Sequence, residues 1–197
     1  MSVEPPPDPL RELGAWIEEA RAKGLAHPGA ATFATADVDG RPSARTVTLK
    51  RLEPDALVFT SALWTRKARE IEANPHVALV FFWPELGRQA QVAGTVAVGD
   101  RPLAEELYAE RDPLHQLQTI VSRQGGPIDA TEVEEMHARL AHLAEVQEAP
   151  PQCPDDWGAL VVTPEVIELW TEAPDRLHER RFFERSGADW TVQLLSP

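Results

Sequence analysis

The sequence predicts a small antiparallel β-barrel with helices packed against its outside, a fold of the mainly-β or α+β class. Three observations indicate this class. Period-two hydrophobic patterns dominate residues 30–98, helical patterns follow over residues 101–148, and strand patterns return from about residue 159. The chain has 197 residues, 43% of them hydrophobic, which suits one domain with its own core. We therefore expect a single domain over residues 1–197, with a flexible lead-in at 1–7 and a helical insertion between barrel strands at 101–148.

A helix and then a β-hairpin are expected at the N-terminal end. Asp8-Pro9 is typical of an N-cap followed by a first helical position, and apolar residues then recur at helical spacing until Gly24. From Ala30 the period changes to two. The pattern predicts a strand at Ala30–Ala36, a tight turn at residues 37–40 and a return strand at Ser43–Arg51.

The next segments predict a strand, a short helix and two further strands. Leu57–Ser61 has strand character, and Thr65 can cap a helix that Asn74-Pro75 ends. Val77–Trp83 is a dense apolar run, which is typical of a buried strand. Gln89–Val98 alternates between polar and apolar residues, so it is expected to be the antiparallel neighbour of that strand.

Helices make up the insertion, and strands return after it. Short helices are expected at residues 102–110 and 114–123. Thr131 and Glu134 have the spacing of a capping box, which predicts a helix that continues to about residue 146. Its inward-facing residues are expected to be Met136, Leu140 and Leu143. A proline-containing loop at 148–156 then leads to expected strands at 159–163, 166–170 and 190–195.

The composition excludes several classes of function. The chain is acidic, with a net charge of −13, so a general nucleic-acid or anionic-membrane surface is not expected. No apolar run approaches the roughly 20 residues of a membrane-spanning helix, and the first residues lack the pattern of a signal peptide. We therefore expect a cytoplasmic protein.

Neither a metal site nor a disulfide is expected. Cys153 is the one cysteine, which excludes an internal disulfide framework and any cysteine-based zinc site. His137 and His142 are five residues apart, a spacing that does not place two metal ligands on one helix face. Phosphate-loop, dinucleotide-binding and nucleophile-elbow motifs are absent from the sequence.

Basic residues gather in two short segments of this acidic chain. Of the three lysines, one lies in Arg45–Lys50 and another in Thr65–Lys67. Arg66 and Lys67 would fall in the first turn of a helix, where the helix dipole disfavours cations by up to ~1 kcal/mol. A bound anion removes this conflict, because backbone N–H groups and both side chains can then converge on it. The hypothesis is a site for the phosphate of a flavin nucleotide; the alternative is a solvated basic turn balanced by Glu70 and Glu72.

The strand that carries Arg45 gives a weaker signal. In a regular strand Val47 and Leu49 share one face, while Thr46, Thr48 and Lys50 share the other. Arg45 and Lys50 differ in parity, so they point to opposite faces unless the strand is bulged. The alternative interpretation is an ordinary strand that ends in a lysine.

The segment from Asp175 to Arg181 is dense in groups that bind anions or move protons. Arg176, His178 and Arg180 share one parity, so an extended segment presents all three on one face. Histidine exchanges a proton near neutral pH, and Trp170 just upstream could cover an aromatic ring. The alternative is a charged hairpin at the rim of a barrel.

Several short segments, taken in order, resemble the pyridoxine/pyridoxamine 5′-phosphate oxidase family over about residues 8–197. No single segment is decisive, but the ordered set is specific. The segments are Arg45-x-x-x-Leu49-Lys50, Thr65-Arg66-Lys67-Ala68, Ile71-Glu72-x-Asn74-Pro75, Arg88-Gln89, Val121-Ser122-Arg123-Gln124 and Trp170 followed by Arg176-Leu177-His178-Glu179-Arg180. The resemblance implies an FMN-binding split β-barrel with Greek-key-like antiparallel strands, and a homodimer with its sites at the subunit interface.

The resemblance also implies the cofactor and the roles of individual residues. FMN is the implied cofactor, and no metal is implied. The residues at matching cofactor-binding positions are Arg45, Thr46, Val47, Thr48, Leu49, Lys50, Thr60, Ser61, Thr65, Arg66, Lys67, Gln89, Gln124, Gly125, Trp170 and Arg180. The residues at substrate-binding positions are Lys50, Arg111, His115, Arg176 and His178, of which Arg176 and His178 are the expected catalytic residues.

The implied activity is oxidation of pyridoxine or pyridoxamine 5′-phosphate to pyridoxal 5′-phosphate, with oxygen as acceptor and hydrogen peroxide as by-product. The chain departs from the family at the substrate phosphate. A Tyr, Arg and Ser clamp is here Leu107, Arg111 and His115, with Tyr108 one residue out of register. A family serine is here Gly125, and a shorter N-terminal arm is expected. His115 could donate to a phosphate, although a surface position on a helix is the favoured interpretation.

These departures leave two alternatives open. One is a related flavin-dependent oxidase with a different substrate, such as a phenazine precursor. The other is a split-barrel protein that binds flavin or haem without turnover. The pair Arg176 and His178 argues against the second alternative, because a pure binder needs no proton-handling group there.

Overall fold

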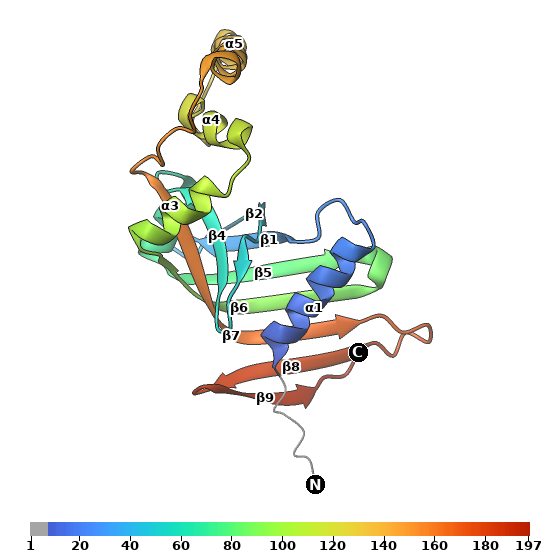
Figure 1. Cartoon of the computed structure of the whole chain (residues 1–197). Helices are drawn as coiled ribbons and strands as arrows, with labels where there is room; N and C mark the ends of the chain where they lie inside the picture. Colours follow the sequence, from blue (N-terminus) through green and yellow to red (C-terminus); the bar gives the residue numbers. More distant parts are fainter. Residues whose placement is uncertain (1–7) are drawn as a thin grey trace. The chain divides into compact units, whose positions relative to one another are not determined.

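A computed structural model describes residues 8–197 of the chain (Figure 1). The expected lead-in at residues 1–7 lies outside the described part. Contacts between Cα atoms divide the chain into two compact units. The first unit contains the chain up to Phe59 together with Glu70–Ala97 and Val161–Pro197, and the second contains Thr60–Arg69 and Val98–Leu160. The prediction of a single domain with a helical insertion remains a prediction.

One sheet and five α-helices form the described part of the chain. The helices are α1 (Pro9–Ala22), α2 (Arg66–Ala73), α3 (Arg101–Ala109), α4 (Pro113–Val121) and α5 (Ala130–Val146), with a short 3-10 helix, η1, at Pro84–Leu86. The strands are β1 (Ala30–Ala36), β2 (Pro42–Thr48), β3 (Arg51–Leu52), β4 (Leu57–Ala62), β5 (His76–Trp83), β6 (Arg88–Val98), β7 (Trp157–Thr171), β8 (Glu179–Ser186) and β9 (Asp189–Leu194).

The strands form a nine-stranded sheet in the order β2-β1-β5-β6-β7-β4-β3, and β8 and β9 continue it from β7. The pairs whose registers are described are antiparallel, among them β1 with β2, β5 with β6 and β7 with β8. Helices separate the first six strands from the last three. The mainly-β or α+β class is therefore confirmed, and its helices occur where the periodicity changes in the sequence.

Helix α1 begins and ends as the sequence predicts. The Asp8 side chain accepts hydrogen bonds from the backbone N–H groups of Leu10 and Arg11, both at 3.1 Å, and Pro9 occupies the first turn. The helix crosses β5 and β6 in Figure 1 and buries its apolar face there. Trp16 packs edge-on against Trp83 of β5, with ring centroids 6.3 Å apart.

The hairpin of β1 and β2 is confirmed, but the predicted return strand Ser43–Arg51 is wrong in its length. β2 ends at Thr48, and a separate strand, β3, begins at Arg51. The backbone N–H of Leu49 donates to Gly29 O at 2.8 Å, whereas that of Lys50 donates to Val58 O at 2.8 Å. The chain thus changes its neighbouring strand between two adjacent residues, which hydrophobic alternation cannot reveal.

Two further strands differ from expectation. β5 was predicted to be buried throughout, but burial alternates along it, and Phe82 is 58% exposed. The two strands expected at 159–163 and 166–170 are one strand, β7. Pro164 does not interrupt it because Gly94 of β6 leaves room. A Cβ atom at position 94 would lie 2.1 Å from Thr163 O and 2.9 Å from Pro164 Cα.

The second unit has a small aromatic core of its own. Ala62, Tyr108 and Trp157 are buried together, and the Tyr108 and Trp157 rings meet edge-on with centroids 6.1 Å apart. The capping box of helix α5 is formed by Asp129 and Glu132, two residues earlier than the expected Thr131 and Glu134.

The inward face expected of α5 is only partly formed within the described chain. Met136, Leu140 and Leu143 are half-buried, and no residue of α5 is fully buried. In residues 8–197 no helix is both long and apolar enough to cross a membrane.

Replacing Gly94 by Ala should destabilise the first unit strongly. The new methyl group would meet backbone atoms that cannot move aside, so we expect the free energy of unfolding to fall by about 2 kcal/mol or more. The control is Gly24→Ala, where φ is +74° and no atom lies within 4 Å, so only the cost of the left-handed backbone applies. That cost is about 1 kcal/mol. Urea denaturation of both variants measures the difference; an equal loss contradicts the close approach of β6 and β7.

Candidate active site

A buried lysine lies at the start of α2 in the second unit. Lys67 is 8% exposed, and its Nζ donates to Ser61 Oγ at 2.8 Å and to Thr65 Oγ1 at 3.3 Å. Ser61 and Thr65 are buried as well, and their hydroxyl oxygens are 3.2 Å apart. Strand β4 supplies Ser61 and the first turn of α2 supplies Lys67, so the two elements hold one ammonium and two hydroxyls together.

This cluster has the donor chemistry that a phosphate requires. The first turn of α2 contains no acidic residue, and the positive end of the helix dipole lies there. The first N–H groups of a helix have no acceptor within the helix, so they are available to an anion. Arg66 is exposed beside Lys67, and Thr60 precedes Ser61 as a half-buried residue of β4. These residue types suit a phosphate monoester, although both hydroxyls of the cluster donate to Ala62 O in this arrangement, and a phosphate site in this segment remains a prediction.

Arg45 lies in β2 of the first unit and is held on several sides. Its NH1 donates to Phe33 O at 3.1 Å and to Thr35 Oγ1 at 2.7 Å, and its NH2 donates to Ser43 Oγ. The same NH2 lies 3.4 Å from Glu70 Oε2, and that carboxylate belongs to a residue that is 5% exposed. Glu70 was predicted only as a balancing surface charge; it is a buried partner of Arg45.

The rest of the Arg45–Lys50 segment divides as follows. Arg45 and Val47 are half-buried on one face of β2, whereas Thr46 and Thr48 are exposed on the other. Leu49 and Lys50 lie in the break between β2 and β3, and the Lys50 side chain is exposed. Arg45 and Lys50 were expected to point to opposite faces of one strand. They do not lie in the same strand, so alternation does not relate their directions.

Arg176 and His178 lie in the turn between β7 and β8, which corrects the idea of an extended segment with three residues on one face. Arg176 is exposed and has φ of 66°, a left-handed conformation that is uncommon for a residue other than glycine. Its N–H donates to Ala173 O at 3.0 Å, and the N–H of Leu177 donates to Asp175 Oδ1 at 3.0 Å. The tight turn thus sets the position of Arg176. The alternative of a charged hairpin describes this part of the backbone correctly.

The His178 ring has a defined neighbour and a defined tautomer. It lies against Trp170, with ring centroids 4.8 Å apart. Its Nδ1 accepts a hydrogen bond from the backbone N–H of Ala173 at 3.1 Å. Because Nδ1 is the acceptor, the neutral ring carries its proton on Nε2. His178 therefore presents a hydrogen-bond donor on its other side.

Arg180 is the second residue of β8 and is fixed by a buried acid. Its Nε donates to Glu168 Oε1 at 2.8 Å and its NH2 to Glu168 Oε2 at 3.1 Å, a bidentate pair. The hydrogen bond to Glu168 raises the pKa of the Arg180 guanidinium further above its ordinary value. The third contact is with Ser196 O at 3.1 Å. Gln89, another expected cofactor contact, is half-buried in β6 opposite Phe82 of β5.

Tyr108 and Arg111, in the second unit, are turned into its core. The Tyr108 hydroxyl donates to Gln116 O at 3.0 Å, and burial raises its pKa. Gln116 Nε2 in return donates to Tyr108 O at 3.0 Å and to Arg111 O at 3.2 Å. Tyr108 therefore does not take the place of the tyrosine that the family has one position earlier.

The Arg111 guanidinium lies over the Trp157 ring, with Cζ 4.5 Å from the ring centroid. Its NH2 donates to His115 O at 3.0 Å and to Thr119 Oγ1 at 3.3 Å. Burial lowers the pKa of this guanidinium. The His115 side chain itself is exposed on α4, which agrees with the favoured surface interpretation.

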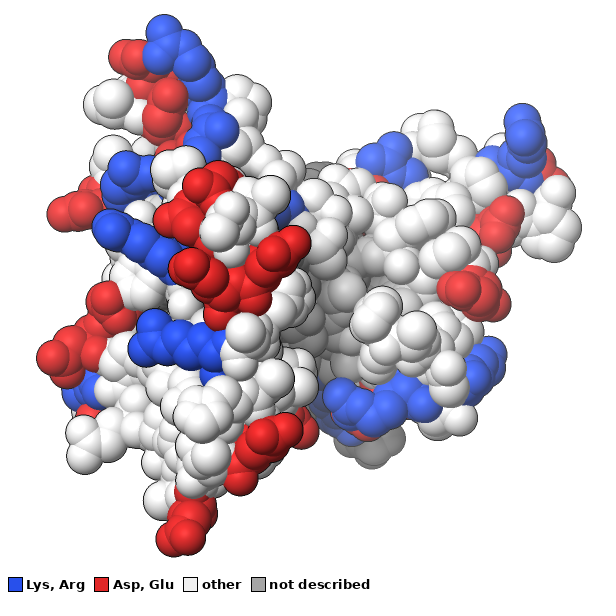
Figure 2. All heavy atoms as spheres, turned by 90° about the horizontal axis from the view of Figure 1, so that it is seen from above, with Lys and Arg blue, Asp and Glu red and all other residues white. Residues whose placement is uncertain are grey.

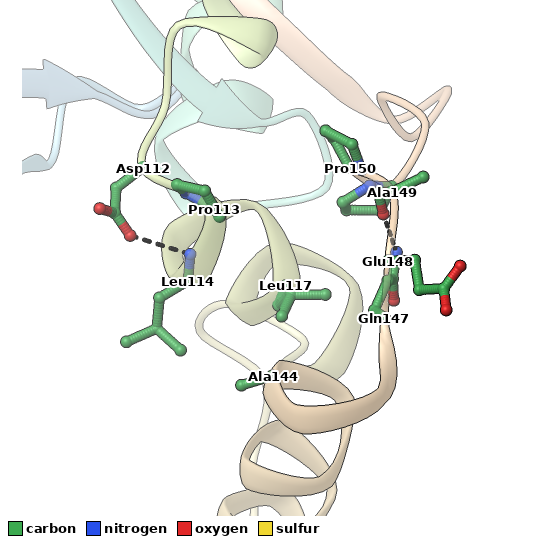
Figure 3. Close-up of a pocket in the computed structure, with 10 residues that line it drawn as sticks. Asp112, Pro113, Leu114, Leu117, Ala144, Gln147, Glu148, Ala149 and Pro150 are labelled. Atoms are coloured by element: carbon green, nitrogen blue, oxygen red, sulfur yellow. Dashed lines mark hydrogen bonds between the residues drawn. The ribbon is translucent and has the colours of Figure 1, made fainter.

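Two cavities of the second unit differ in what lines them. Gln124 and Gly125 lie in the loop after α4 and line a cavity of about 590 Å³ together with Arg123 and Arg139. Gly125 has φ of 78°, and Gln124 O accepts from Trp64 Nε1 at 3.2 Å. A second cavity, of about 530 Å³, is shown in Figure 3. None of the predicted site residues lines it, and Leu117 of α4 and Ala144 of α5 form part of its apolar wall.

Neither basic nor acidic side chains dominate the face drawn in Figure 2. Basic and acidic side chains are interspersed there. Among residues 8–197 no group of three or more His, Cys, Asp or Glu side chains is arranged to hold a metal ion. Three charged groups of the described chain contain predicted site residues, and they are built around Lys67, Arg45 and Arg180.

Sequence reasoning missed the two buried acids. Glu70 and Glu168 are 5% and 8% exposed, and each holds an arginine that was expected to bind the cofactor. Glu168 is a lone acid in the apolar run Val166–Trp170, and such isolation is a signal that could have identified it. Glu70 has no such signal, because it lies among other charged residues of a short helix.

Two family models match the chain. The first is described as pyridoxamine 5′-phosphate oxidase and covers residues 17–140. The second is described as the C-terminal dimerisation region of pyridoxine 5′-phosphate oxidase and covers residues 157–197.

Curated relatives of the chain are named pyridoxine/pyridoxamine 5′-phosphate oxidase. A pyridoxine/pyridoxamine 5′-phosphate oxidase of Rubrobacter xylanophilus is 44% identical over 97% of this chain and 88% of its own length. One from Sphingopyxis alaskensis is 42% identical over 96% and 88%.

Solved structures agree with the expected split barrel. PhzG from Burkholderia lata, crystallised with tetrahydrophenazine-1-carboxylic acid, superposes with a TM-score of 0.89 at 27% identity, over 98% of this chain and 95% of that one. A pyridoxamine 5′-phosphate oxidase-related, FMN-binding protein from Nostoc punctiforme has a TM-score of 0.79 at 19% identity over the full length of both chains, which supports the fold. With two matching family models and relatives above 40% identity over nearly all of its length, the chain belongs to the pyridoxamine 5′-phosphate oxidase family and is an oxidoreductase.

Proposed function

We propose that the chain is an FMN-dependent oxidase that converts pyridoxine or pyridoxamine 5′-phosphate to pyridoxal 5′-phosphate, with oxygen as acceptor and hydrogen peroxide as by-product. The observation that carries the cofactor assignment is the cluster of Ser61, Thr65 and Lys67 at the start of α2. The names of the relatives, at up to 44% identity, support the substrate.

The donor set is consistent with FMN rather than with an unphosphorylated flavin. An ammonium, two hydroxyls and a helix N-terminus are the groups that stabilise a phosphate dianion. When bound, FMN supplies the two-electron redox chemistry and passes the electrons to oxygen. Lys67, Ser61, Thr65 and Arg66 would hold its phosphate, and Arg45 and Arg180 are further proposed FMN contacts.

The turn between β7 and β8 is proposed to orient the substrate. Arg176 is exposed in a strained backbone conformation, and such strain is often kept where a side chain must face a ligand. His178 can donate a hydrogen bond from Nε2 while Ala173 fixes its Nδ1. The substrate loses a hydrogen with its electron pair from the carbon that is oxidised and a proton from the attached hydroxyl or amino group, and the amine substrate also takes up water and releases ammonia. Arg176 and His178 would steer the substrate and stabilise the charge that develops on its ring oxygen or nitrogen.

A homodimer is part of the proposal. The matched dimerisation region spans residues 157–197, which contain β7, β8 and β9. β9 exposes apolar side chains, with Leu194 76% and Val192 47% exposed, as is expected of a strand that another chain covers. We propose that the sites form at the interface of two such subunits.

A second candidate substrate has specific support. The Tyr108 hydroxyl is engaged with Gln116 O, and Arg111 NH2 with His115 O and Thr119 Oγ1, so at the expected clamp for a substrate phosphate only Arg111 Nε is a buried donor without a partner among the described residues. PhzG, the solved relative at 27% identity, holds a tricyclic carboxylic acid that has no phosphate. Oxidation of a reduced tricyclic acid by the same flavin chemistry is therefore the alternative activity.

The substrate assay separates these two activities. Purified protein loaded with FMN should oxidise pyridoxine 5′-phosphate in air and release pyridoxal 5′-phosphate and peroxide in equal amounts. The aldehyde absorbance and a coupled peroxide assay measure both products. No turnover with either vitamin phosphate, together with oxidation of a reduced phenazine carboxylic acid, would establish the alternative.

Replacing Lys67 by Ala should weaken FMN binding by ~1.5–3 kcal/mol, because one charge-assisted contact to the phosphate is lost. Riboflavin, which lacks the phosphate, should bind the variant and the wild type almost equally. Fluorescence titration of both flavins gives the comparison, with exposed Lys23→Ala as the matched control. FMN affinity that is unchanged in Lys67→Ala contradicts the phosphate assignment.

The donor role of His178 can be tested with its two amide replacements. A Gln side chain places an amide N–H close to the former Nε2, whereas Asn is too short to do so. We expect His178→Gln to keep kcat/KM within about tenfold of wild type and His178→Asn to lose about a hundredfold, the loss that follows from one hydrogen bond to a charged group. Equal losses in both variants would instead indicate that the ring serves as a proton acceptor.

A further inference from the structure

Glu70 is a buried carboxylate at the junction of β1, β2 and α2. Its Oε2 accepts hydrogen bonds from Thr35 Oγ1 and, at 2.6 Å, from Ser43 Oγ. The Arg45 NH2 lies 3.4 Å from the same oxygen. A carboxylate buried to this extent is stable only when it is paired and hydrogen-bonded, and Glu70 meets both conditions.

The same network restrains the Arg45 guanidinium. Thr35 Oγ1 accepts from NH1 and donates to Glu70, while Ser43 Oγ accepts from NH2 and donates to the same carboxylate oxygen. The Phe33 carbonyl on β1 holds NH1 as well. The long arginine side chain, 23% exposed, is thus fixed by groups on two strands and one helix. Without such restraint an arginine loses much rotamer freedom when it binds a ligand.

We propose that Glu70 is a positioning residue for the phosphate end of the flavin nucleotide, and that it acts by fixing Arg45 in one orientation. This inference rests on the proposed function, in which Arg45 contacts FMN. Glu70 is buried and is not itself proposed to touch the cofactor.

A positioning role and a purely electrostatic role of Glu70 predict opposite changes in FMN affinity when Glu70 is replaced. A carboxylate near a phosphate repels it, so the loss of that charge alone would tighten FMN binding. If Glu70 serves to orient Arg45, the loss of its hydrogen bonds weakens FMN binding, and a neutral amide of the same size restores much of it. Glu70→Ala and Glu70→Gln therefore distinguish the two roles.

The experiment measures Kd for FMN and for riboflavin in the wild type, Glu70→Ala, Glu70→Gln and Glu72→Ala. Glu72 is the matched control, because it is an exposed acid on the same helix. We expect Glu70→Ala to raise the Kd of FMN about tenfold or more and to leave that of riboflavin within about twofold. Glu70→Gln should stay within about threefold of wild type, and Glu72→Ala should match wild type.

Two results would overturn the inference: FMN and riboflavin weakened equally by Glu70→Ala, or FMN bound as tightly as before or more tightly. Circular dichroism and thermal melting check the fold of each variant. If Glu70→Ala does not fold, Ser43→Ala decides, since it removes one link between Glu70 and Arg45. A selective loss for FMN supports the inference, and unchanged FMN affinity contradicts it. If the wild type binds FMN no more tightly than riboflavin, the proposed phosphate site itself is refuted. If the wild type prefers FMN and Glu70→Ala keeps the same preference, only the role of Glu70 is refuted.

Discussion

The local structure around the predicted site residues depends on how the protein restrains positive charge in a chain of net charge −13. Lys67 is held by two hydroxyls, Arg45 by Glu70 with two further hydroxyls, and Arg180 by a bidentate contact with Glu168. Each arrangement restrains a cation by contacts within the protein itself. Such preorganisation reduces the entropy that binding must overcome and aligns donors with an anion.

The parts of the fold that depend on local signals were predictable from the sequence. Asp8-Pro9 predicts the start of α1, and the turn at residues 37–40 predicts the first hairpin, because capping and turn chemistry involve only neighbouring residues. The continuity of β7 through Pro164 was not predictable, since it depends on Gly94 in another strand. The alternating burial of β5 depends in the same way on which face of the sheet is covered.

The candidate site shows the same division. The residue types at Arg45, Lys67, Arg176 and His178 could be recognised in order along the chain, but their geometry could not. From the alternation of residues we expected 176–180 to be extended. Arg176 instead adopts a left-handed turn conformation, which a periodic pattern cannot predict. The partner Glu70 was hidden among 32 acidic residues, because burial distinguishes it and composition does not, whereas Glu168 stands alone in an apolar run.

We propose that this member of the pyridoxamine 5′-phosphate oxidase family uses a phosphorylated flavin. The most direct test is to purify the protein, release any bound flavin by denaturation, and identify it by chromatography and mass spectrometry. We expect FMN, in up to one molecule per chain after reconstitution, with a flavin absorption band in the visible range. A chain that acquires no flavin band when it is incubated with excess FMN, while it remains folded, would contradict FMN as the cofactor.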